Sequence, residues 1–172
     1  TTVPVGSPRT YTNTVNGTGT CGPAIATSTL EIISTVTWTG SSNTNWNNAA
    51  NWTCGFIPTG AVSATIPNVA NKPVLSSGGG AAVKDLVIAP GATLTLTGNT
   101  LTVNGTVTGS NSLNASAGTV VFAGQAAQVI PAGLFTGNAV MNLTVNNTNG
   151  VTLAGPAGVS GIVRVTAGSL AS

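Results

Sequence analysis

The sequence predicts an all-β protein built around a short parallel β-solenoid, and three observations lead to this fold class. Thr, Asn, Ser and Gly together supply 84 of the 172 residues, and Thr mixed with Val, Ile and Leu favours β-strands. The hydrophobic fraction of 41% and the net charge of only +2 differ from those of a disordered chain, which combines low hydrophobicity with high net charge. From Val74 onward, short runs of alternating apolar and polar residues recur between Gly and Asn turn signals.

The repeated runs indicate stacked coils. They read LVIAPGATLTLTG, LTVNGTVTG, GTVVFAG, NLTVNNTNGVTLAG and GIVRVTAG. Strands this short cannot bury an apolar face alone, whereas coils stacked on one another form one continuous apolar column. Equivalent strands recur roughly every 20 to 30 residues, which lies in the range of solenoid repeats. A shift of 57 residues places Leu86 on Leu143 and Leu94 on Val151.

This overlay and the period-two alternation predict which side chains fill the interior. The expected inward-facing residues are Leu86, Ile88, Leu94, Leu96, Leu101, Val103, Val120, Phe122, Leu143, Val145, Val151 and Leu153. The competing fold is an antiparallel β-sandwich, which also combines short strands with Gly turns.

Residues 1–36 precede the repeats and contain two expected strands, around residues 9–15 and 24–35, joined by a Gly-rich turn. Because two strands do not make a stable domain alone, we interpret them as the closing strands of an immunoglobulin-like domain. The alternative is a hairpin packed on the segment that follows.

Residues 37–73 differ from both neighbours, because Trp38, Trp46 and Trp52 lie there together in Asn-rich chain. We expect the indoles to fill a small core that caps the solenoid, since repeat proteins need an atypical terminal unit. The alternative is a carbohydrate-binding platform that uses the same three rings. Residues 74–172 then form the solenoid repeats, which we expect to be truncated at the C-terminus.

Cys21 and Cys54 are the only cysteines, and their spacing matches no metal motif and no CxxC pair. The composition resembles that of exported proteins, in which one disulfide is the default for two cysteines. We therefore predict a Cys21–Cys54 disulfide that ties the hairpin to the cap.

The ionisable residues exclude most catalytic chemistry. The chain has no His, and its two carboxylates, Glu31 and Asp85, are 54 positions apart, whereas general acid–base catalysis needs titratable groups gathered in one place. Two Cys without His fall short of a zinc site, and calcium sites need more carboxylates.

The cations are scattered and do not form the patch typical of nucleic-acid binders: Arg9, Lys72, Lys84 and Arg164. No apolar run reaches the ~18 residues of a membrane helix. We expect no enzyme activity, cofactor, metal, nucleic-acid partner or membrane span.

The stretch from Trp38 to Trp52, WTGSSNTNWNNAANW, followed by TCGFIPTGAVSATIPN and the Thr/Val repeats, resembles the β-solenoid segment of very large surface proteins of gliding bacteria. The type IX secretion system exports those proteins, and the similarity covers about residues 36–170. It implies an extracellular or cell-surface location and a role in adhesion or gliding motility, with no catalytic residues to carry over. The implied partners are the secretion machinery during export, neighbouring domains of the same long chain, and surface polysaccharide. The sorting domain of such cargo is not present in this sequence, which fits a fragment.

Three function hypotheses follow. The first is a structural or adhesive segment of a surface protein, and the second is a carbohydrate-binding module. The third is a polysaccharide-cleaving β-helix enzyme, for which the chain lacks the gathered acid and base side chains that catalysis needs. The run TLTLTGNT resembles the Thr arrays of ice-binding solenoids, but the later runs VVF, LTV and VRV interrupt it. Asn-x-Ser/Thr triplets are expected by chance in a chain this rich in Asn and Thr, and they begin at Asn16, Asn51, Asn104, Asn114, Asn142 and Asn146.

Overall fold

The chain divides into two compact units, Thr1–Ser34 and Thr35–Ser172. The computed structural model describes residues 10–19, 22–31, 33–76 and 79–172. Within that part of the chain, no helix is long and apolar enough to cross a membrane.

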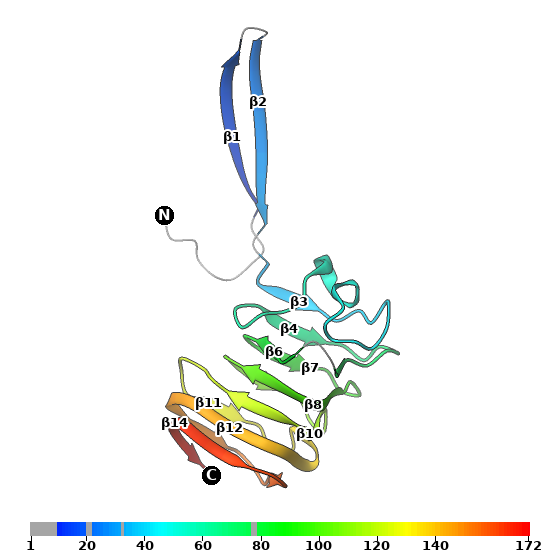
Figure 1. Cartoon of the computed structure of the whole chain (residues 1–172), viewed down its shortest axis with the longest axis vertical. Coiled ribbons are helices and arrows are strands. Elements are labelled where there is room, and N and C mark those ends of the chain that lie inside the picture. The colour runs from blue at the N-terminus through cyan, green and yellow to red at the C-terminus, as the bar shows by residue number, and fades with distance from the viewer. Residues whose placement is uncertain (1–9, 20–21, 32, 77–78) are drawn as a thin grey trace. The chain divides into compact units, whose positions relative to one another are not determined.

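The first unit contains a β-hairpin (Figure 1). Strand β1 (Thr10–Gly19) pairs antiparallel with β2 (Gly22–Glu31), from Thr10 opposite Glu31 to Gly19 opposite Gly22. The assignment of this hairpin to an immunoglobulin-like domain stays a prediction.

The second unit is a parallel β-solenoid of about five turns. Every strand pair described in Thr35–Ser172 is parallel, so the predicted solenoid is confirmed and the antiparallel sandwich is excluded. Its strands are β3 (Thr35–Thr37), β4 (Ser63–Ile66), β5 (Val74–Leu75), β6 (Ala81–Val83), β7 (Leu86–Ile88), β8 (Leu94–Val103), β9 (Val107–Thr108), β10 (Leu113–Phe122), β11 (Gln128–Ile130), β12 (Phe135–Leu153), β13 (Gly158–Val159) and β14 (Val163–Ala171). Two 3₁₀ turns, η1 (Ala49–Asn51) and η2 (Thr53–Gly55), follow β3.

The strands form three stacks, because each coil contributes up to three extended segments. The first stack is β3, β4, β7 and β9. The second stack is β5 with the first parts of β8, β10 and β12, followed by β13. The third stack is β6 with the second parts of β8 and β10, the middle of β12, and β14. In β8 the chain passes from the second stack to the third at Gly98, whose φ of +81° is readily adopted only by glycine. Figure 1 shows the coils layered from β3 to β14.

Columns of apolar side chains form the core. In the third stack, one column contains Val83, Val103, Phe122, Val145 and Val165, each paired with the next. The first four are fully buried, and Val165, on β14, is 49% exposed. Successive members lie 20, 19, 23 and 20 residues apart along the chain. The coil is therefore shorter and more regular than the sequence indicated.

The 57-residue overlay is wrong in its register. Leu86 pairs with Ala64 and Val107 in the first stack, whereas Leu143 pairs with Val120 and Val163 in the third. All three stacks share the same period-two alternation, so an overlay by pattern alone matches segments from different stacks. The parallel stacks also begin at β3, well before Val74.

The inward-facing positions nonetheless agree with the sequence for all but one residue. Leu153 is half-buried, and the other eleven predicted side chains are buried. Leu153 pairs with Ile130 on one side, and the strand on its other side, β14, pairs with Val151 and Thr152 but not with Leu153.

Two buried amides, of Gln128 and Asn147, join the coils at the corner between the third stack and β11. The Gln128 Oε1 atom accepts hydrogen bonds from Gly124 N at 2.8 Å and Asn147 Nδ2 at 2.9 Å. The Nε2 atom of Gln128 donates to the carbonyls of Val103 and Gly105 in the preceding coil, at 3.0 and 2.7 Å. Since buried polar groups need partners, this network fixes how adjacent coils are aligned.

Candidate functional site

The three Trp residues lie together at the β3 end of the solenoid, within its first coil. Trp38 follows β3 directly, Trp52 forms an antiparallel bridge with Trp38, and Trp46 N donates to Val74 O at 3.0 Å. The Trp52 ring packs edge-on against both of the others, with centroid distances of 5.1 Å to Trp38 and 4.7 Å to Trp46. Such edge-to-face pairs are a favoured aromatic geometry.

The indole N–H groups are turned toward the protein. Trp38 Nε1 donates to the Asn71 carbonyl, and Trp52 Nε1 donates to the Trp46 carbonyl, both at 2.8 Å. Trp46 Nε1 is buried without a partner within the described residues. Gly40, with a φ of +59°, permits the close approach of Asn71, because a Cβ at this position would lie 2.7 Å from the Asn71 carbonyl oxygen.

Asn51 organises the loop that carries the rings. It is fully buried, and its Oδ1 accepts from the backbone N–H groups of Ser42 and Asn43 at 2.9 and 3.0 Å. Its Nδ2 donates to Asn43 Oδ1 and to the Asn45 carbonyl at 2.8 and 3.0 Å. A glycan on the Asn51 triplet is incompatible with this arrangement, because the amide is buried and fully used.

The burial of the rings distinguishes a structural cap from a carbohydrate-binding platform. Trp38 and Trp46 are 0% exposed and Trp52 is 3% exposed, so none presents a face on which a sugar ring could stack. Phe56, in the same segment, is 37% exposed and carries no neighbouring aromatic platform among the described rings. The cluster has the geometry of an apolar core that closes one end of the column.

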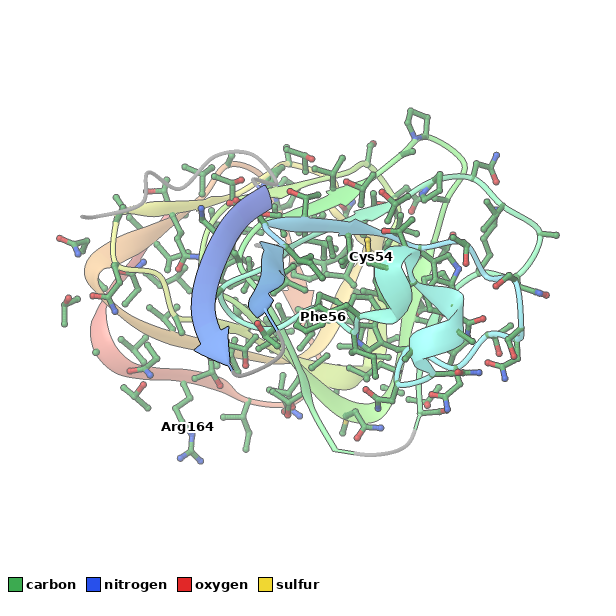
Figure 2. All side chains as sticks on the ribbon, turned by 90° about the horizontal axis from the view of Figure 1, so that it is seen from above. Cys54, Phe56 and Arg164 are labelled. Carbon is green, nitrogen blue, oxygen red and sulfur yellow. The ribbon has the colours of Figure 1, made fainter. Side chains whose placement is uncertain are left out.

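Cys54 lies on η2 with a φ of +59° and is exposed, with no disulfide partner among the described residues (Figure 2). Cys21 lies outside the described residues. The predicted disulfide therefore stays a prediction.

Alkylation of the unreduced protein followed by intact-mass measurement tests this pairing. We expect neither thiol to be alkylated, because the bridge would close a loop of about 33 residues, which stabilises a protein by roughly 3 to 4 kcal/mol on the chain-entropy model. Two alkylated thiols would refute the disulfide.

The titratable side chains that the structure describes do not gather. Asp85 Oδ1 accepts from Thr106 N and Oγ1 at 2.7 and 2.9 Å, and its Oδ2 accepts from Ser63 Oγ at 2.9 Å. Burial raises the pKa of Asp85, but the hydrogen bonds from Thr106 and Ser63 and the charge of Lys84 outweigh it, so the pKa lies below its ordinary value. Asp85 is therefore an ionised carboxylate that links three coils at a corner. Among the described side chains, no group of three or more His, Cys, Asp or Glu is placed to hold a metal ion.

The Thr array of β8 is not repeated on the next coils. In the second stack, Thr95 pairs with Asn114 and Thr97 with Ala117, whereas in the third stack Thr100 pairs with Thr119. Asn142 then follows Thr119 in the next coil. The outer surface of this stack is thus polar but chemically mixed.

Hollows on the described outer surface of the solenoid include two that bring together residues from neighbouring coils. One, of about 660 Å³, is lined mainly by backbone and aliphatic groups of residues 87–91 and 108–110. The other, of about 220 Å³, is lined by Thr119, Asn142, Thr144, Ile162 and Arg164. The sequence alone did not group the residues that line these hollows, because they come from different coils and only the register of the coils shows which of them are neighbours.

Comparison with known proteins identifies a family. No curated protein and no solved structure matches the chain significantly. The model of a family described as a domain of unknown function, DUF8693, matches residues 37–152, from the end of β3 to the end of β12. This range includes the Trp cluster and most of the coils. The chain therefore belongs to the DUF8693 family.

Proposed function

We propose that the chain is a non-catalytic structural segment of a large secreted cell-surface protein that serves adhesion or gliding motility. The observation that carries this proposal is the uninterrupted apolar column, closed at one end by the three buried indoles. A stack of this kind transmits load and spaces other domains, because parallel strand pairs join each coil to the next.

Two further features support a structural role. Asp85 is the only carboxylate among the side chains from residue 33 onward that the structure describes, and its oxygens are occupied by hydrogen bonds from Ser63 and Thr106. The buried amides of Gln128 and Asn147 are likewise used within the protein. Export by the type IX secretion system, and the secretion machinery as a partner, rest on the resemblance of residues 36–170 to solenoid segments of such cargo.

Carbohydrate binding through Trp38, Trp46 and Trp52 was the other candidate. No contact or exposed ring face in the described cluster favours it, since the three rings are buried.

Immunolabelling of intact cells of the organism that encodes the chain tests the proposed location. We expect antibodies against residues 35–172 to label unpermeabilised cells, and external protease to remove the label. In a strain that lacks a functional type IX translocon, the surface signal should be lost. A signal seen only after permeabilisation of wild-type cells would contradict the proposal.

A further inference from the structure

The 220 Å³ hollow on the third stack spans three consecutive coils. Thr119 of β10 pairs with Asn142 of β12, and Thr144 of β12 pairs with Arg164 of β14. Thr144 lies between the buried Leu143 and Val145, and side chains alternate between the two sides of a strand. The lining side chains of this hollow therefore point away from the core.

The hollow offers polar groups that have no partner among the residues that the structure describes. Arg164 is exposed and projects outward from the ribbon (Figure 2). Neither its guanidinium nor the Thr144 hydroxyl makes a hydrogen bond or ion pair within the described residues. The one carboxylate side chain that the structure describes from residue 33 onward, on Asp85, is occupied at another corner.

Other lining groups are fixed in place. Asn142 Oδ1 accepts from Ile162 N at 2.9 Å, and Asn142 Nδ2 donates to Thr119 Oγ1 at 3.3 Å. These bonds hold the amide between neighbouring coils. The Ile162 side chain beside it is 58% exposed, so it presents an apolar surface next to the guanidinium.

We propose that this hollow binds a uronic acid residue of an acidic polysaccharide, an inference that rests on the proposed surface location. A planar carboxylate matches the Arg164 fork and can accept two parallel hydrogen bonds from it. The Thr144 hydroxyl pairs with a ring hydroxyl, and Ile162 packs on the C–H face of the sugar. Arg164 is the one charged residue among those that line the hollow, which favours a single carboxylate over nucleic acid, whose binding needs several clustered cations. Because the hollow lies on the side of the solenoid, a polymer chain can extend past it.

Titration of the ¹⁵N-labelled chain with trigalacturonic acid at low ionic strength, followed by NMR, tests this site. We expect saturable shifts centred on residues 142–144 and 162–164, and at least a tenfold weaker affinity for Arg164→Gln. Thr144→Val should weaken binding severalfold. The matched control is Lys84→Gln, which removes the same charge at a distant corner and should bind as the unmodified chain does. The neutral methyl ester of the trisaccharide should bind to the unmodified chain as weakly as the free acid binds to Arg164→Gln.

The proposal fails if the acid gives no saturable shifts, if Arg164→Gln binds it equally well, or if Lys84→Gln loses as much affinity. None of these results bears on the cell-surface location, which immunolabelling measures separately. Conversely, immunolabelling could place the protein inside the cell while it still binds the acid through Arg164. That result would refute the proposed function but confirm the binding site.

Discussion

Replacing Trp46 with Ala is expected to lower the free energy of unfolding by about 3 to 5 kcal/mol, the usual cost of truncating a large buried aromatic side chain. The ring is fully buried and packs edge-on against Trp52. Its removal leaves a cavity at the end of the column and exposes Trp52. Chemical denaturation monitored by far-UV circular dichroism measures the change.

Two matched variants separate the contributions of the ring. Trp46→Phe should cost clearly less than Trp46→Ala, because it keeps an aromatic ring and removes an indole N–H that is buried without a partner among the described residues. Phe56→Ala, in the same segment but at an exposed position, should cost less than about 1 kcal/mol. Unchanged stability of Trp46→Ala together with lost polysaccharide binding would instead assign the cluster to sugar recognition.

Asn147→Ala is expected to lower the free energy of unfolding by about 2 to 4 kcal/mol, because it removes the three hydrogen bonds of a fully buried side chain. Asn147 Nδ2 donates to the Ala126 carbonyl and to Gln128 Oε1, at 2.7 and 2.9 Å. Its Oδ1 accepts from Asn149 N at 2.8 Å. The substitution leaves these groups inside the corner without their partner.

The neighbouring Asn146 is the control for this prediction, since it is exposed. Asn146→Ala should change stability by no more than about 0.5 kcal/mol. Equal effects of the two substitutions, measured by the same denaturation experiment, would show that the buried amide does not hold the coils in register.

The fold was predictable because its determinants are local. Alternation in runs such as those of β8 and β10 identifies the inward residues, and their burial follows from period two alone. The parallel arrangement followed from strand length, since segments of two or three residues such as β5 and β6 bury a face only when stacked.

The register was not predictable in the same way. Leu86 and Leu143 look equivalent in sequence but lie in different stacks, because a coil of 19 to 23 residues contains three similar segments. Gln128 and Asn147 resemble ordinary polar loop residues, and only the stacked coils show that they are buried. The hollow beside Arg164 depends on the same register, so its residues could not be grouped from spacing.

The sequence predicted the position of the Trp cluster but not whether its rings are buried or exposed. A cap and a sugar-binding platform require the same residues, and they differ only in whether the ring faces point inward. The structure shows all three buried, a consequence of the loop that Asn51 holds in place.

Intrinsic fluorescence gives the most direct test of the structural role of the cap, because all three Trp residues of the chain belong to this cluster. We predict a blue-shifted emission that iodide barely quenches, that does not respond to neutral or acidic oligosaccharides, and that shifts to the red in one transition with unfolding. A red-shifted, iodide-accessible emission that changes when polysaccharide is added would contradict the account and place the indoles on a binding surface.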